Sequence, residues 1–326
     1  MQFFAASRLV IVAGKGGVGK TTVTATLARA ASRHGLSTLI VEVEGKSGLS
    51  SMFGEAPFAY DEVVLAEADE ATRVAEIRAR TLTPDDALLE YLGDKGMNRI
   101  SKRLVNTGAL DMVATAVPGI RDILVLGKVK QLERGTSADL LILDAPAAGH
   151  AITFLQSARG LADAVRVGPI NAQARDVLDL LGDAERCQVM LVTLPEETPV
   201  NELVETAFNL EDRVGVSLGP VVVNGMYPSL PGLGTDPAVA AKEAATTLRR
   251  GEAGSLAEAS AFRRERMALQ AQQVARLAEQ LPLDQLHLPY LFDAELGPAQ
   301  LDQLADALLA AIGGLPDLVG SGRPPA

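Results

Sequence analysis

The sequence contains a single cysteine, Cys187, among 326 residues. One cysteine cannot form an internal disulfide, and it cannot supply the pair of thiolates that zinc sites use. Because Cys187 begins an apolar run, we expect it to be a small buried residue of the core.

Basic charge and long apolar runs are also scarce. The chain has 30 Lys and Arg against 41 Asp and Glu, for a net charge of −11, which argues against nucleic-acid partners and against a polybasic membrane patch. No apolar run approaches the ~20 residues of a transmembrane helix, and the first predicted strand begins without a signal-peptide pattern. We therefore expect a cytoplasmic protein with no nucleic-acid partner and no stable membrane insertion.

A glycine-rich loop is the most informative feature that is present. It follows the apolar run 9–13, precedes a helical pattern over 23–34 and fits Gly-x-x-x-x-Gly-Lys-[Ser/Thr]. In such loops backbone N–H groups surround phosphate oxygens at a helix N-terminus. We expect Lys20 to contact the terminal phosphates and Thr21 to ligate Mg²⁺. The residues expected to form this phosphate loop are Gly14, Gly16, Gly17, Val18, Gly19, Lys20, Thr21 and Thr22.

An alternative interpretation uses the same glycines. Gly14, Gly16 and Gly19 also spell the Gly-x-Gly-x-x-Gly of a dinucleotide site, and Glu42 or Glu44 lies near the spacing of its ribose-binding acid. A lysine followed by a hydroxyl at positions 20 and 21 has no role in that fold, so we favour the nucleoside triphosphatase.

Short apolar runs separated by helical stretches predict an α/β fold. A parallel sheet covered by helices on both faces produces this pattern, and its ligands bind at the carboxyl ends of the strands. Polar residues follow three of the runs at that edge: Glu42 with Glu44, Asp144 and Asn224. The predicted strands are 9–13, 38–43, 63–66, 139–143, 188–193, 219–223 and 285–290.

The domain organisation is predicted to be one P-loop domain over 1–313 with a flexible tail at 314–326. Residues from about 82 to 135 have helical periodicity without a strand, which indicates a helical insert that packs in the core, in a dimer or around an apolar partner. Two helices are expected over 236–280, with 262–266 as a solvated face, and a last helix over 298–312.

Four stretches together resemble a known family. They are Lys-Gly-Gly-Val-Gly-Lys-Thr-Thr at 15–22, Asp-x-Pro-x-x-Gly-His at 144–150, Pro118-Gly119-Ile120 and Pro195-Glu196. With these the chain resembles the deviant-Walker P-loop ATPases, within them the arsenite-pump and tail-anchored-protein-targeting ATPases, and it is similar to an actinobacterial branch of anion-transporter ATPases. The resemblance covers most of the chain and is weakest at 230–280.

The resemblance implies ATP and Mg²⁺ as ligands and assigns roles to further residues. Lys15 matches the signature lysine that reaches the phosphates of the partner subunit in a dimer, and Asp144 matches the Walker B acid that holds Mg²⁺ through water. Gly149 and His150 fall in the second switch. Asn224 matches the asparagine that reads adenine, and the loop expected to cover the base is Tyr290, Leu291, Phe292 and Asp293.

The sequence departs from the family pattern at the first switch and at the metal-binding positions. Glu44-Gly45-Lys46-Ser47 stands where the family has Asp-Pro-Ala-His, so Glu44 is expected to polarise the attacking water, with slow turnover and Glu42 as a substitute. Residues 258–263, where the targeting ATPases carry Cys-x-x-Cys, are Glu-Ala-Ser-Ala-Phe-Arg, and one cysteine cannot bind arsenite. We expect neither structural zinc nor arsenite.

These observations favour an ATP hydrolase that acts as a dimeric switch. The dimer would pair two identical chains or this chain with a paralogous ATPase, and the helical insert would handle a protein or membrane-protein partner. The alternatives are a positioning ATPase like MinD and ParA, and a weakly hydrolysing half of a heterodimer.

Overall fold

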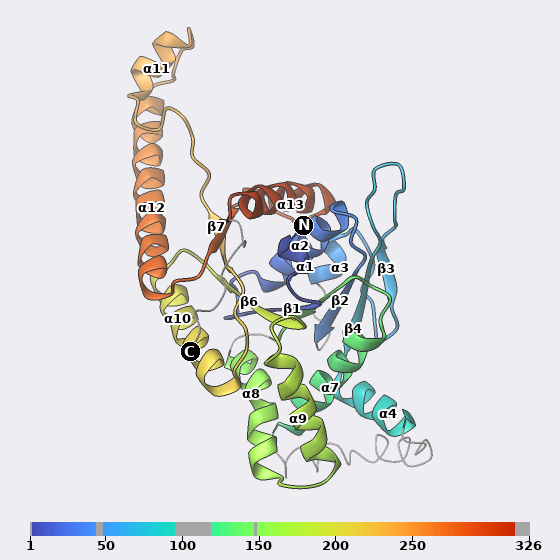
Figure 1. The fold of residues 1–326 in the computed structure, drawn as a ribbon. Coiled ribbons are helices and arrows are strands. Elements are labelled where there is room, and N and C mark those ends of the chain that lie inside the picture. Colours follow the sequence, from blue (N-terminus) through green and yellow to red (C-terminus); the bar gives the residue numbers. More distant parts are fainter. Residues whose placement is uncertain (1, 44–47, 95–118, 147–148, 317–326) are drawn as a thin grey trace.

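An eight-stranded, mostly parallel sheet forms the centre of the molecule, so the predicted α/β class is confirmed (Figure 1). The computed structural model describes residues 2–43, 48–94, 119–146 and 149–316. The strands follow the spatial order β3-β4-β2-β5-β1-β6-β7-β8. Their bounds are β1 Leu9–Gly14, β2 Thr38–Val43, β3 Val63–Ala66, β4 Ile77–Leu82, β5 Leu140–Asp144, β6 Cys187–Thr193, β7 Val221–Met226 and β8 Gln285–Pro289.

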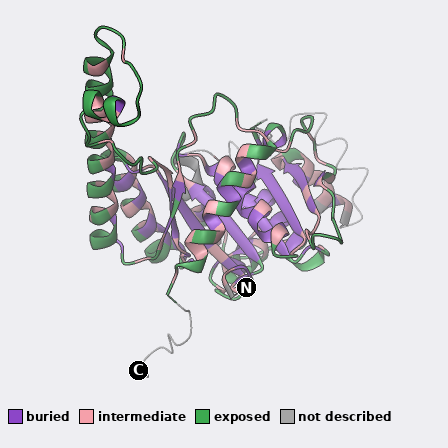
Figure 2. Cartoon of the chain, turned by 90° about the horizontal axis from the view of Figure 1, so that it is seen from above, coloured by how far each residue is buried: buried purple, intermediate pink, exposed green. Residues whose placement is uncertain are grey.

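Helices cover both faces of the sheet because alternate residues of each strand point to opposite faces and so contribute to two apolar cores. Leu9, Ile11 and Ala13 of β1 belong to one core, whereas Val10 and Val12 belong to the other. Figure 1 shows helices on both sides of the sheet, and Figure 2 shows that the strands are buried. The first core is covered by α7 Ile120–Gly135, α8 Gly149–Ala164, α9 Pro169–Leu181 and α10 Glu197–Val214, and the second by α1 Gln2–Ala5, α2 Lys20–Arg33, α3 Gly48–Met52 and α13 Pro298–Gly313.

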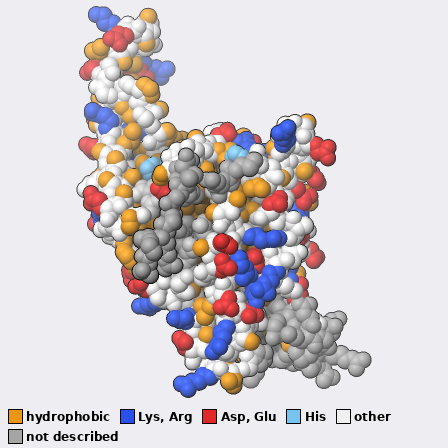
Figure 3. Space-filling model, viewed as in Figure 1, with side chains coloured by type: hydrophobic (Ala, Val, Ile, Leu, Met, Phe, Trp, Pro, Cys, Tyr) orange, Lys and Arg blue, Asp and Glu red, His pale blue; other side chains and the backbone are white. Residues whose placement is uncertain are grey.

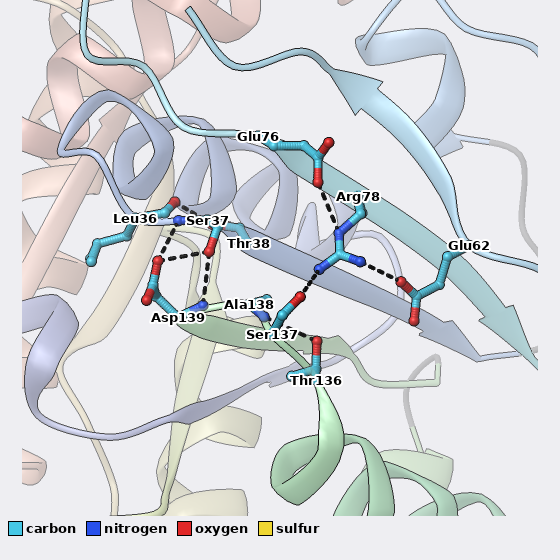
Figure 4. A network of polar contacts seen from close by, with 10 residues as sticks. All are labelled: Leu36, Ser37, Thr38, Glu62, Glu76, Arg78, Thr136, Ser137, Ala138 and Asp139. Atoms are coloured by element: carbon cyan, nitrogen blue, oxygen red, sulfur yellow. Dashed lines mark hydrogen bonds and ion pairs between the residues drawn. The ribbon is translucent and has the colours of Figure 1, made fainter. Parts of the chain in front are cut away.

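The strand β4 is absent from the sequence-based prediction, which placed no strand between 66 and 139. It pairs with β2 in parallel and with β3 antiparallel, so one edge of the sheet is not parallel. Its sequence Ile-Arg-Ala-Arg-Thr-Leu carries two arginines rather than a continuous apolar run. Ion pairs accommodate one of them, since Arg78 contacts Glu62 at 2.9 Å and Glu76 at 3.0 Å and also donates to Ser137 (Figure 4).

Between β4 and β5 the described residues form α4 Pro84–Asp94 and α7, which pack against each other. The intervening residues 95–118 of the expected insert lie outside the described ranges, as do residues 317–326 of the expected tail. None of the helices in the described ranges is long and apolar enough to cross a lipid bilayer.

Two helices project from the body of the molecule as an arm, α11 Pro237–Glu243 and α12 Glu252–Gln280 (Figure 1). Every residue of α12 is described, and only Gln270 and Leu277 are buried. Helix α12 reaches the body through its C-terminal half, which contacts α10 and β7.

Candidate functional site

The glycine-rich loop leaves the carboxyl end of β1, between β5 and β6. Gly14 lies opposite Val192 of β6, and a Cβ atom at position 14 would be 2.5 Å from the Val192 carbonyl oxygen. Only glycine therefore lets the two backbones approach this closely. Val18 is buried in the core below α2, so the loop is anchored at its far end while Lys15, Gly16 and Gly17 are exposed.

Helix α2 begins directly after the loop. Gly19 is its N-cap residue, with φ 88°, a left-handed conformation that favours glycine. Glycine has no side chain with which to cap the helix, so the first N–H groups of α2 remain suited to binding an anion, as the sequence motif predicts.

Lys20 lies against the loop that it follows. Its side chain is buried, with the residue 8% exposed, and its Nζ donates a hydrogen bond to the Lys15 carbonyl oxygen at 3.1 Å. The ammonium group is therefore held beside the backbone expected to surround the phosphates, where its charge would attract an anion most strongly.

Thr21 and Asp144 meet at the end of β5, beside the loop. The Thr21 hydroxyl donates to Asp144 Oδ2 at 2.7 Å, and Asp144 is buried at 6% exposure. A hydroxyl and a carboxylate are the hard oxygen ligands that Mg²⁺ prefers, directly or through water. The donor set therefore fits the metal that the sequence predicts.

Lys15 is bound within its own chain. Its Nζ forms an ion pair with Glu202 Oε1 of α10, and both side chains remain partly exposed, at 50% and 31%. The structure thus connects the signature lysine to a helix that sequence reasoning did not associate with it.

The first-switch residues Glu44 to Ser47 lie outside the described ranges, so the predicted water-polarising role of Glu44 stays a prediction. Glu42 is described and is buried at 5% exposure. It lies opposite Asp144 in the sheet and accepts a hydrogen bond from Thr81 at 3.4 Å. Two buried carboxylates therefore lie on adjacent strands near the expected metal.

The second switch is described only in part. Residues 147–148 lie outside the described ranges, and Gly149 and His150 begin α8.

Thr22, the last residue expected in the phosphate loop, belongs to the first turn of α2, where its carbonyl accepts a hydrogen bond from Thr26 at 2.8 Å.

The residues expected to surround the base come together from β7 and β8. Asn224 Nδ2 donates to the Val18 carbonyl at 2.9 Å, so the amide touches the phosphate loop. The Tyr290 N–H donates to Met226 at 2.8 Å, which places the loop after β8 next to the end of β7. Phe292 and Asp293 are exposed, whereas Leu291 packs partly against the core.

Three residues of this region were missed by sequence reasoning. Tyr227 contributes a ring 5.4 Å from Tyr290 and 5.5 Å from Phe292. Arg263 lies over this cluster, and Gln270 binds the end of β7. The prediction that 262–266 is a solvated face holds for residues 262, 264 and 265, which are exposed, but not for Arg263, which packs on aromatic rings, or for Arg266, which pairs with Glu196. No local signal identifies these contacts, since they join α12 to strands far away in the sequence.

Comparisons with known proteins show which family the chain is similar to. Residues 7–167 match the family model described as anion-transporting ATPase. The chain is 33% identical over 229 residues to ATPase BagA of Mycobacterium tuberculosis, across 68% of this chain and 66% of the relative. It is 25% identical over 225 residues to ATPase get3 of Pyrenophora tritici-repentis, across 68% of this chain and 60% of the relative. A third relative, ATPase GET3 of Phaeosphaeria nodorum, is 26% identical over 203 residues, across 61% and 58%.

Proposed function

The chain belongs to the anion-transporting ATPase family, and from that premise we propose that it hydrolyses ATP with Mg²⁺ and acts as a dimeric switch. The observation that carries the proposal is the hydrogen bond between Thr21 and Asp144 beside the buried Lys20. The aligned part spans 66% of ATPase BagA, so the activity of the whole chain is inferred from its own site.

The roles of the site residues follow from their chemistry. The loop N–H groups and Lys20 bind the phosphates, and Thr21 with Asp144 would hold Mg²⁺, which supplies Lewis-acid polarisation of the terminal phosphate. Glu44 remains our candidate for orienting the attacking water. Asn224 and the loop Tyr290–Asp293 bind the adenine, since exposed aromatic rings beside an amide suit a planar base.

The dimeric switch rests on Lys15. A second lysine within the loop adds positive charge where the transition state spreads negative charge, and an exposed lysine can supply that charge to a neighbouring subunit. Mg-ATP would favour the closed dimer and hydrolysis the open one, because the nucleotide binds the two states with different affinity. The partner subunit would be a second copy or a paralogous ATPase.

The client is proposed to be a protein or membrane protein that binds the helical insert, of which α4 and α7 are described. Two alternatives are a positioning ATPase like MinD and ParA and a weakly hydrolysing half of a heterodimer. Capture of partners by a Glu44→Gln variant held in ATP would distinguish these alternatives from the client-binding switch. A paralogue alone would favour the heterodimer, whereas ATP-dependent sedimentation with liposomes or DNA would favour positioning.

The decisive test is Mg²⁺-dependent ATP hydrolysis by Lys20→Ala, with Lys242→Ala on the exposed face of α11 as the control. We expect Lys20→Ala to lose binding and turnover and Lys242→Ala to retain both. Turnover that survives Lys20→Ala would overturn the site assignment. Dimerisation in ATP is measured separately with Lys15→Ala, which we expect to remain monomeric while still binding ATP.

A further inference from the structure

We propose that Arg263 and Gln270 of α12 are positioning residues for the site that binds the adenine, and that they couple the projecting arm to the adenine of the bound nucleotide. The inference rests on the proposed function, because it needs a nucleotide at the phosphate loop. It assigns a role to a helix that lies outside the alignment of residues 7–167 with the family.

Gln270 fastens α12 to the end of β7. The residue is buried at 4% exposure, and Leu277 is the only other buried residue of this helix, all of which is described. Its Oε1 accepts a hydrogen bond from the Tyr227 N–H at 2.9 Å, and its Nε2 donates to the Gly225 carbonyl at 3.1 Å. The buried Gln270 amide thus uses both its oxygen and its nitrogen on backbone groups at the end of β7, as buried polar groups require.

Arg263 fastens the same helix to the aromatic rings, two turns nearer the tip of the arm. Its Cζ lies 4.9 Å from the centroid of the Tyr227 ring and 4.7 Å from that of Phe292, and its Nη2 donates to the Pro228 carbonyl at 2.8 Å. The flat guanidinium suits stacking on rings, which a lysine would not reproduce. The ring of Phe292 is held in place although the residue is 62% exposed.

These contacts connect α12 to the phosphate loop through Asn224 and Gly225 of β7 and Tyr227 directly after it. Asn224 binds Val18 of the loop, whereas Gly225 and Tyr227 bind Gln270. An adenine that binds Asn224 and the Tyr290–Asp293 loop therefore lies next to the Tyr227 and Phe292 rings, which Arg263 of α12 contacts. Any shift of Phe292 or of the strand end on base binding must be followed by Arg263 and Gln270.

Apart from Arg263 and Gln270, helix α12 is held to the body by Arg266, which pairs with Glu196, and by Arg276, which donates to Asn201 of α10. Residues 252–269 of α12 are exposed or half-exposed throughout, and the projecting arm carries scattered apolar side chains on its surface (Figure 3). Helices with few buried contacts unfold locally at low free-energy cost. The order of residues 252–269 therefore depends on the contacts where α12 meets the body of the molecule. A nucleotide that stabilises the aromatic cluster should therefore order the arm, whereas a ligand that fills only the phosphate loop should not.

The test compares two probes, Mg-ATP and Mg-tripolyphosphate, by calorimetry on the full chain. Arg263→Ala should weaken ATP binding by roughly three- to tenfold, in line with the loss of a stacked cation, and leave tripolyphosphate affinity within twofold of the wild type. Arg264→Ala, which removes the exposed neighbouring arginine, should change neither. Equal ATP affinity in Arg263→Ala and the wild type would overturn the inference, as would equal losses for both probes, which would indicate a purely structural role.

Hydrogen exchange provides the second measurement. ATP should slow exchange within 252–269 of the wild type, tripolyphosphate should not, and the effect of ATP should vanish in Arg263→Ala. Protection by both probes alike would also overturn the coupling. A wild type that binds neither Mg-ATP nor Mg-tripolyphosphate would contradict the proposed function itself, which distinguishes that outcome from a failure of the coupling.

Discussion

Lys15 lies in the phosphate loop and Lys20 begins α2 directly after it, and the structure holds their amines in different ways. The Lys20 ammonium is buried against the Lys15 carbonyl, whereas Lys15 reaches outward to Glu202 and remains half-exposed. A buried, positioned ammonium suits a fixed role toward phosphates in the same chain. An exposed ion pair can exchange one partner for another at small cost, because such pairs contribute little in water.

This difference leads to a prediction for Glu202. If Lys15 must leave Glu202 to reach a partner subunit, Glu202→Gln should strengthen ATP-dependent dimerisation. The gain should be modest, about two- to fivefold in the dimer dissociation constant, because both side chains are partly solvated. Sedimentation velocity in Mg-ATP measures it. Glu205→Gln, exposed one turn further along α10, is the control and should match the wild type. A weaker dimer in Glu202→Gln would mean that Glu202 belongs to the interface.

At the scale of elements, α7 is joined to the turn before β6 by a buried acid. Glu133, 5% exposed, accepts two hydrogen bonds from Arg186, at 2.6 and 3.3 Å. This hydrogen bonding raises the pKa of the Arg186 guanidinium above its usual value. The pair fixes the helix that follows the undescribed part of the insert.

Glu133→Gln should therefore lower the free energy of unfolding by about 1.5–3 kcal/mol, because a charge-assisted pair of hydrogen bonds is lost in a buried position. Urea unfolding followed by circular dichroism measures the change. Asp176→Asn makes the same change of acid to amide at a carboxylate that is 58% exposed and pairs with Lys130, and it should shift the free energy of unfolding by no more than about 0.5 kcal/mol. Equal effects of the two variants would show that burial of Glu133 does not determine the strength of its pair.

The elements that the sequence predicts well are those whose signal is local. The apolar runs of β1, β2 and β5 and the glycine loop before α2 each need only neighbouring residues to be recognised. By contrast, Arg78 of β4 pairs with Glu76, two residues before it, and with Glu62 beside the neighbouring strand β3. The contact with Glu62 is not visible in Ile77–Leu82 itself. Likewise, Arg263 and Gln270 acquire their contacts only when α12 packs beside β7.

At the scale of the whole molecule, the candidate site joins parts of the chain that are remote in sequence. The phosphate loop follows β1, Asp144 ends β5, and Asn224 lies in β7, three strands of one sheet. Sequence reasoning placed each of these at the carboxyl edge because parallel strands end there together. A nucleotide bound to all three must stabilise the sheet as a unit, since unfolding any of these strands would destroy the site.

The single cysteine reports on that global stabilisation. Cys187 is fully buried at the start of β6, opposite Leu9 of β1, and burial raises the pKa of its thiol well above the usual value. Because the thiolate is the reactive form, a thiol reagent at pH 8 should modify Cys187 only after the central sheet opens. Mg-ATP at about 100 times its dissociation constant should then slow modification by up to about 100-fold. Rates followed by absorbance of the released chromophore test this, and Lys20→Ala should show no slowing. Fast modification of the wild type that ATP does not affect would mean that Cys187 becomes accessible through a local opening, and that nucleotide binding does not stabilise β6.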